Sequence, residues 1–208
     1  MIEYLEFFAK AFVTIFIIVD PPGNIPLFMS LTEFASEEDK EAISKKATLI
    51  GLFLLLLVAI TGTFVLDVFR ITIDGLRIAG GILLFIIAVD ILIGDRRKRK
   101  YIEDDGEGTD VDSIATFPIA LPLYTGPGAI TAAIVLYSTA DTILLKFLVL
   151  LAIIITYAIV RITHMYRNQI LRALGRSGSN IFARLMTIFI AAIGIEYIFT
   201  GLMGKIPL

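Results

Sequence analysis

The chain has 208 residues, of which 57% are hydrophobic, and its mean hydropathy of +0.88 lies far above that of a soluble domain. The formal net charge of −2 favours no bulk charged partner, and the absence of Cys excludes disulfides and thiolate metal sites. Apolar residues form continuous runs, such as 52–57, instead of alternating with polar ones, which is typical of membrane helices and not of barrel strands.

Six apolar segments follow one another along the chain, and each can cross a hydrocarbon core of about 30 Å. They cover residues 7–31, 47–66, 75–93, 114–139, 142–160 and 185–202. We therefore expect an all-α integral membrane protein with six transmembrane helices.

Two of these segments are interrupted by Pro-Gly motifs deep inside the apolar run. The first reads Asp20-Pro21-Pro22-Gly23-Asn24, and the second reads Thr125-Gly126-Pro127-Gly128. Because Pro lacks a backbone donor and Gly stabilises helices poorly, spans 1 and 4 are predicted to be broken helices. Unwound backbone at that depth must be buried in protein or line a water-filled cavity.

The two halves of the chain correspond in more than these motifs. Pro22 and Gly23 map onto Pro127 and Gly128 at a shift of 105 residues, and the lone carboxylates Asp90 and Glu196 of the third spans correspond at a shift of 106. Three spans per unit place the second unit upside down, which predicts an inverted repeat. The alternative is two coincidental turns.

The predicted organisation is a single membrane domain with a charged centre. Residues 1–94 form the first three-helix repeat, 95–113 a charged linker and 114–208 the second repeat. Thirteen Lys and Arg lie in the segments after spans 1, 3 and 5, against five on the other side. This excess predicts a cytoplasmic linker and extracytoplasmic termini in a plasma-membrane protein. The basic run at 96–100 is interpreted as a topology signal, with no nucleic-acid partner.

The interruptions combine groups of both polarities. Free N–H groups at a restarting helix suit a carboxylate, and the carbonyls that end the preceding helix suit an ammonium. Together they favour a small zwitterionic solute, and the glycines allow it close to the backbone. The candidate substrate-binding residues are Asp20, Pro22, Gly23, Asn24, Thr125, Gly126, Gly128 and Thr131.

Three carboxylates are candidates for coupling or gating. In a functional role, Asp20 contacts a substrate ammonium or carries the coupling proton. In a structural role, it accepts hydrogen bonds that hold the interruption open. Asp90 and Glu196 are either coupling groups or acids that reach toward the membrane interface.

Three further predictions concern packing glycines, the single histidine and the absence of enzyme motifs. Gly80-Gly81 and the small residues at 191–194 favour close packing of the two third spans. His164, the only histidine, is predicted to be an interfacial residue. Motifs of hydrolases and ATP-driven pumps are missing, so we expect neither an enzyme nor a cofactor or metal site.

At its two motifs the chain resembles the MarC family of six-span membrane proteins. The matching stretches are residues 20–28 and 122–131. The resemblance implies uptake of small neutral amino acids such as glycine and alanine, coupled to a proton or sodium gradient. The alternative is a passive channel or a membrane assembly factor without a transport cycle.

Overall fold

The computed structural model describes residues 2–33, 35–93, 111 and 115–205, and every regular element within them is a helix. The first half contains α1 (Ile2–Val19), α2 (Ile25–Leu31), α3 (Glu37–Val68) and α4 (Ile73–Ile93). The second half contains η1 (Ala115–Tyr124), α7 (Pro127–Ser138), α8 (Ile143–Met165) and α9 (Arg167–Met203). The linker predicted at 95–113 lies outside the described residues except for Val111.

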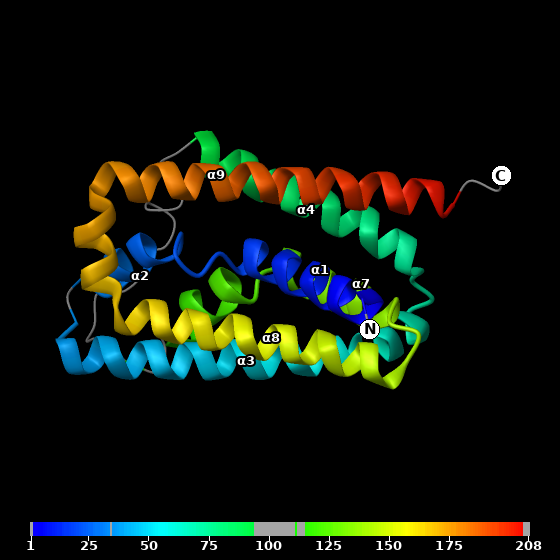
Figure 1. The fold of residues 1–208 in the computed structure, drawn as a ribbon, viewed down its shortest axis with the longest axis horizontal. Coiled ribbons are helices and arrows are strands. Elements are labelled where there is room, and N and C mark those ends of the chain that lie inside the picture. The colour runs from blue at the N-terminus through cyan, green and yellow to red at the C-terminus, as the bar shows by residue number, and fades with distance from the viewer. Residues whose placement is uncertain (1, 34, 94–110, 112–114, 206–208) are drawn as a thin grey trace.

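The long helices lie roughly along one axis (Figure 1). α3 and α8 run side by side along one edge, α4 and α9 run along the other, and α1 and α7 lie between them. The first part of α9 crosses the left end of the molecule before the helix turns to follow α4. The central position of α1 and α7 places both interrupted segments inside the bundle.

The chain ends and the middle of the chain lie at opposite ends of this bundle. Figure 1 shows both termini at the right end, whereas α4 finishes and η1 begins at the left end. α3 and α8, the second helix of each predicted repeat, therefore run in opposite directions. The side of a membrane that each end faces stays a prediction.

Two helix starts are specified locally. Ser36 caps α3 by accepting a hydrogen bond from the Asp39 N–H at 3.1 Å, and acidic residues fill the first turn. Thr142 caps α8 in the same way from the Leu145 N–H at 3.2 Å. Because of its cap, α3 begins ten residues before the apolar run expected at 47–66.

α4 and α9 approach each other at glycines. A Cβ added to Gly81 would collide with the Gly194 carbonyl oxygen, and one added to Gly194 would lie 2.7 Å from the Gly81 oxygen. The predicted close packing of the third spans is confirmed at these two positions. Gly80 instead contacts Thr131 of α7, and Ala192 is exposed.

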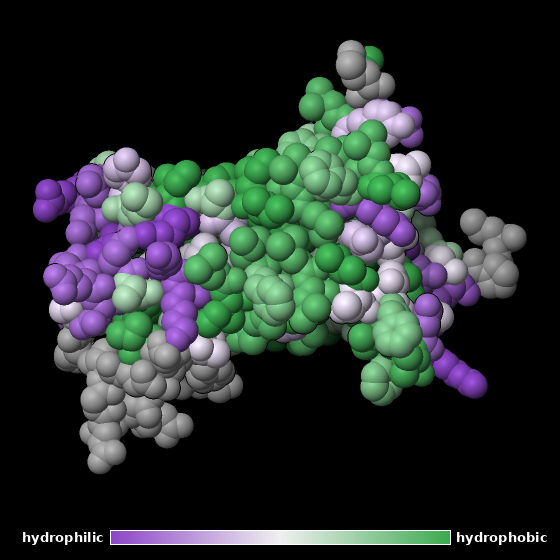
Figure 2. Space-filling model, turned by 90° about the horizontal axis from the view of Figure 1, so that it is seen from below, coloured by the Kyte–Doolittle hydropathy of each residue, from purple (hydrophilic) through white to green (hydrophobic). Residues whose placement is uncertain are grey.

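The described residues include three helices long and apolar enough to cross a membrane: Glu37–Val68, Ile143–Met165 and Arg184–Met203. Pro127–Ser138 is a shorter apolar helix. Figure 2 shows a hydrophobic band between more hydrophilic ends, and large apolar side chains such as Phe53 and Phe64 are exposed on α3. These features identify an α-helical membrane protein, while the count of six spans and the inverted repeat stay predictions.

Candidate functional site

The first interruption, residues 20–24, is held by its own side chains. Asp20 adopts a left-handed backbone conformation (φ 48°), and its Oδ1 accepts a hydrogen bond from the Gly23 N–H at 3.2 Å. Asn24 donates through Nδ2 to the Val19 carbonyl at 2.5 Å. A side chain at Gly23 would collide with the Asp20 carboxylate, so glycine is needed there for the carboxylate to keep this position.

The second interruption, residues 125–126, is held by other helices. The buried Thr125 hydroxyl donates to the Gly51 carbonyl of α3 at 3.2 Å. The same oxygen lies 2.7 Å from the Tyr157 hydroxyl of α8, which is then the donor. Gly51 leaves room for this arrangement, because a Cβ there would lie 2.7 Å from the Tyr157 ring.

The helix before the second interruption is π-helical, where the sequence predicted an ordinary apolar helix. Pro118 and Pro122 lie within this segment and cannot donate backbone hydrogen bonds, which disfavours the α-helical ladder. π-helical segments are rare and occur frequently at functional sites.

Of the remaining candidates of the second motif, Gly128 and Thr131 contact α4. Gly126 is extended (φ −76°, ψ 171°), a conformation open to other residues. Gly128 packs against Leu84, since a Cβ there would lie 3.0 Å from the Leu84 Cγ. Thr131 is buried against Gly80.

The fold brings the two interruptions close together. A Cβ on Gly128 would lie 3.5 Å from Cγ2 of Ile18, which is two residues before Asp20. On the other side, the His164 ring centroid lies 4.2 Å from that of Phe28 in α2. The Nε2 atom of the same ring lies 2.6 Å from the Tyr124 hydroxyl, next to the second interruption.

His164 is the centre of a polar network that the sequence did not reveal. Its side chain is fully buried, although an interfacial residue was expected. Nδ1 lies 3.1 Å from the Ser44 hydroxyl, to which Arg161 also donates at 3.2 Å. The partners Tyr124 and Ser44 lie 40 and 120 residues away, so no local motif marks them.

Two arginines continue this network to the surface. Arg161 forms an ion pair with Glu41 of α3. The buried Arg167 donates to the His164 carbonyl at 3.0 Å and to Glu37 at 2.6 Å. The carboxylate residues are 46% and 64% exposed, so the polar chain leads from Tyr124 to one end of the bundle.

The candidate coupling carboxylates are dispersed. The Asp20 carboxylate accepts a hydrogen bond from the unwound backbone, as expected if its role is to hold the interruption open. This contact does not test the coupling role. Glu196 is exposed on α9. Asp90 belongs to α4, and its side chain lies outside the description. Within the described residues, no group of His, Asp and Glu is arranged to hold a metal ion.

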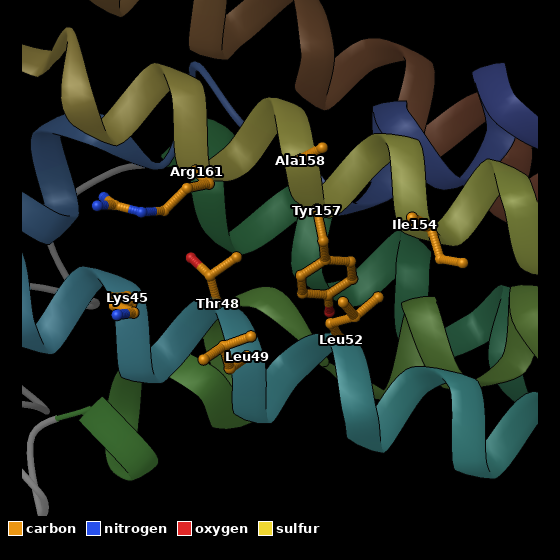
Figure 3. Close-up of a pocket in the computed structure, with 8 residues that line it drawn as sticks. All are labelled: Lys45, Thr48, Leu49, Leu52, Ile154, Tyr157, Ala158 and Arg161. Atoms are coloured by element: carbon orange, nitrogen blue, oxygen red, sulfur yellow. The ribbon is translucent and has the colours of Figure 1, made fainter.

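A pocket of about 320 Å³ opens between α3 and α8 (Figure 3). Tyr157 forms its floor, and the hydroxyl of this ring is the one that contacts Thr125. The pocket is lined by Lys45, Thr48, Leu49, Leu52, Ile154, Tyr157, Ala158 and Arg161. Tyr157 therefore connects this lateral pocket with the second interruption.

Comparison with known proteins identifies one family over nearly the whole chain. Residues 5–206 match the family described as MarC family integral membrane protein. The chain belongs to the MarC family. This confirms the resemblance carried by residues 20–28 and 122–131.

Relatives of this MarC-family chain extend over nearly its whole length. A UPF0056 membrane protein of Archaeoglobus fulgidus is 54% identical, covering 98% of this chain and 95% of the relative. One of Methanocaldococcus jannaschii is 36% identical, covering 97% and 98%. The UPF0056 membrane protein YhcE of Escherichia coli is 34% identical, covering 95% and 93%. No solved structure matches the chain.

Proposed function

We propose that this MarC-family protein is a secondary transporter of small neutral amino acids such as glycine and alanine. The observation that supports the proposal best is the meeting of two interrupted helices within an apolar bundle. Ile18 contacts Gly128 on one side, and His164 joins Phe28 to Tyr124 on the other. Interrupted helices at corresponding places in two halves are typical of transporter binding sites.

The chemistry of the second interruption suits a carboxylate. α7 has no side-chain cap at Gly126, so its first N–H groups have no side-chain acceptor there. The positive end of the helix dipole adds to this preference for an anion. Close packing of Gly128 against Leu84 leaves little room, which favours the smallest amino acids.

The chemistry of the first interruption suits an ammonium. Asp20 brings a carboxylate to the end of α1 and is only partly buried. In this proposal the solute lies between the two interruptions, which open alternately to the two sides of the membrane. A proton or sodium gradient drives accumulation, with Asp20, Asp90 and Glu196 as candidate coupling groups.

Proteoliposomes that contain the purified protein test this function. We expect saturable uptake of labelled glycine and alanine, with counterflow when unlabelled substrate is preloaded. A passive channel would conduct without counterflow, and an assembly factor would give no flux. Either result would contradict the proposal.

The proposed topology has six spans, extracytoplasmic termini and a cytoplasmic linker in the plasma membrane. It is supported by the excess of Lys and Arg and by the position of both termini at one end of the bundle. A Gly106→Cys variant tests it, because the chain has no native Cys. Labelling of this variant from outside intact cells by an impermeant reagent would contradict the topology.

A further inference from the structure

The pocket between α3 and α8 has a regular construction. On each helix, four residues at successive spacings of three, one and three positions form one face. The contributions are Lys45, Thr48, Leu49 and Leu52 from α3, and Ile154, Tyr157, Ala158 and Arg161 from α8. Because α3 and α8 run in opposite directions, Lys45 and Arg161 share one end of the pocket, and Leu52 and Ile154 share the other (Figure 3).

The two ends of the pocket differ in polarity. Leu52 follows Lys45 by seven positions, and Arg161 follows Ile154 by seven. On a helix this distance is about 10 Å. The pocket is therefore cationic at one end and aliphatic about 10 Å away, deeper in the apolar band.

The cationic end carries an excess of positive charge. Arg161 is paired with Glu41 and also donates to Ser44. Lys45 is exposed, and it forms no ion pair with any residue that the structure describes. With the arginine neutralised by its partner, the Lys45 ammonium is the group that remains to attract an anion.

The aliphatic end opens onto the surface that faces lipid. Leu49 is 56% exposed and Ile154 is 44% exposed, and Phe53 continues the same apolar surface. Figure 2 shows the hydrophobic band on α3, with hydrophilic residues gathered at the left end of this face. A ligand of this pocket thus enters from the bilayer, and it needs an apolar chain as well as a negative charge.

We propose that this pocket binds an anionic phospholipid. The headgroup phosphate lies between Lys45 and Arg161, and one acyl chain follows Leu49, Leu52 and Ile154 past Ala158. The volume of about 320 Å³ lies at the small end of the range for ligand pockets, which suits part of one chain. Lys gives a flexible point charge and Arg a planar donor set, and both groups bind phosphate.

A lipid in this position would rest against Tyr157, whose hydroxyl contacts Thr125 at 2.7 Å. The site thus adjoins the second interruption. The proposal depends only on the embedding of the protein in a membrane, and it holds for a transporter, a channel or an assembly factor.

Native mass spectrometry of the purified full chain tests the headgroup contact. Phosphatidylglycerol and phosphatidylcholine with identical acyl chains are titrated separately, and the bound fractions are compared. We expect Lys45→Gln to lower the preference for phosphatidylglycerol about fivefold. Lys205→Gln is the matched control, because it removes an exposed cation near the other end of the bundle and should leave the preference unchanged.

A second variant pair tests the chain contact. Ala158→Phe fills the pocket from an exposed position on α8. It should displace the most tightly bound lipid, whether that lipid is phosphatidylglycerol or phosphatidylcholine. Ala192→Phe, on the exposed face of α9, is the control. Free glycerol phosphate should not compete with phosphatidylglycerol, because it lacks the chain.

Three results would overturn the proposal. The first is a lipid preference in Lys45→Gln equal to that of Lys205→Gln. The second is unchanged lipid binding in Ala158→Phe. The third is efficient competition by glycerol phosphate, which would reduce the site to an anion site.

Discussion

The interruption at residues 20–24 is stabilised from within, whereas the one at residues 125–126 is stabilised by distant helices. In the first, the hydrogen bonds of Asp20 to Gly23 and of Asn24 to Val19 join residues no more than five positions apart. In the second, Thr125 bonds to residues 74 and 32 positions away. Two similar Pro-Gly motifs therefore interrupt their helices by different physical means.

This difference has a consequence for the proposed transport cycle. A locally specified interruption keeps its shape when neighbouring helices move. An interruption held by Tyr157 and Gly51 changes when α3 or α8 shifts relative to it. We therefore expect the second interruption to be the one whose geometry responds to helix movement, and variants at the two places should differ accordingly.

The largest effect is expected at Tyr157. Tyr157→Ala removes a fully buried ring and the bond to Thr125, and should lower the free energy of unfolding by about 3–5 kcal/mol. Tyr157→Phe keeps the ring, and should cost about 1 kcal/mol. Reversible unfolding in mixed micelles measures both values. Equal losses would show that packing contributes little and that the hydroxyl alone supports the interruption.

The next effect is expected at Gly128. Gly128→Val forces a side chain against Leu84 and should cost about 1–3 kcal/mol, with loss of glycine and alanine transport. Gly126→Ala is the control for the folding cost alone, because its extended backbone accepts alanine. The same unfolding assay and proteoliposome uptake report both effects. Normal transport by Gly128→Val would place the substrate elsewhere.

A smaller effect is expected for the bond between Tyr124 and His164. In a double-mutant cycle of Tyr124→Phe and His164→Phe, we expect a coupling free energy of about 1 kcal/mol. His164→Phe keeps a ring against Phe28, so the cycle isolates the hydrogen bond from the packing. A coupling energy near zero would remove His164 as a support of the second interruption.

The smallest structural effect is expected for Asp20→Asn in the first interruption. The amide oxygen can still accept from Gly23, and Asn tolerates a positive φ, so the cost should stay below about 1 kcal/mol. Gradient-driven accumulation should nevertheless be lost if the carboxylate binds the ammonium or carries the coupling proton. Substrate exchange without a gradient separates these roles, since a coupling group alone is not needed for exchange. Accumulation equal to that of the wild type would leave Asp20 a structural role only.

The sequence alone determined the features that depend on near neighbours. Apolar runs marked the membrane helices, and Pro and Gly marked both interruptions, because a missing donor acts wherever the residue stands. Close packing at Gly81 and Gly194 was also visible, since small residues in apolar spans predict it. The hydrogen-bond partners of the first interruption also lie within residues 19–24.

Only the tertiary structure decided which distant groups meet. His164 looked like an interfacial residue among arginines, yet it is buried between Phe28, Tyr124 and Ser44. Tyr157 carried no signal in its own stretch of sequence, although it supports Thr125 and lines the pocket between α3 and α8. Hydrogen bonds and packing act over a few ångströms, so such contacts depend on the register of helices that the chain order leaves open.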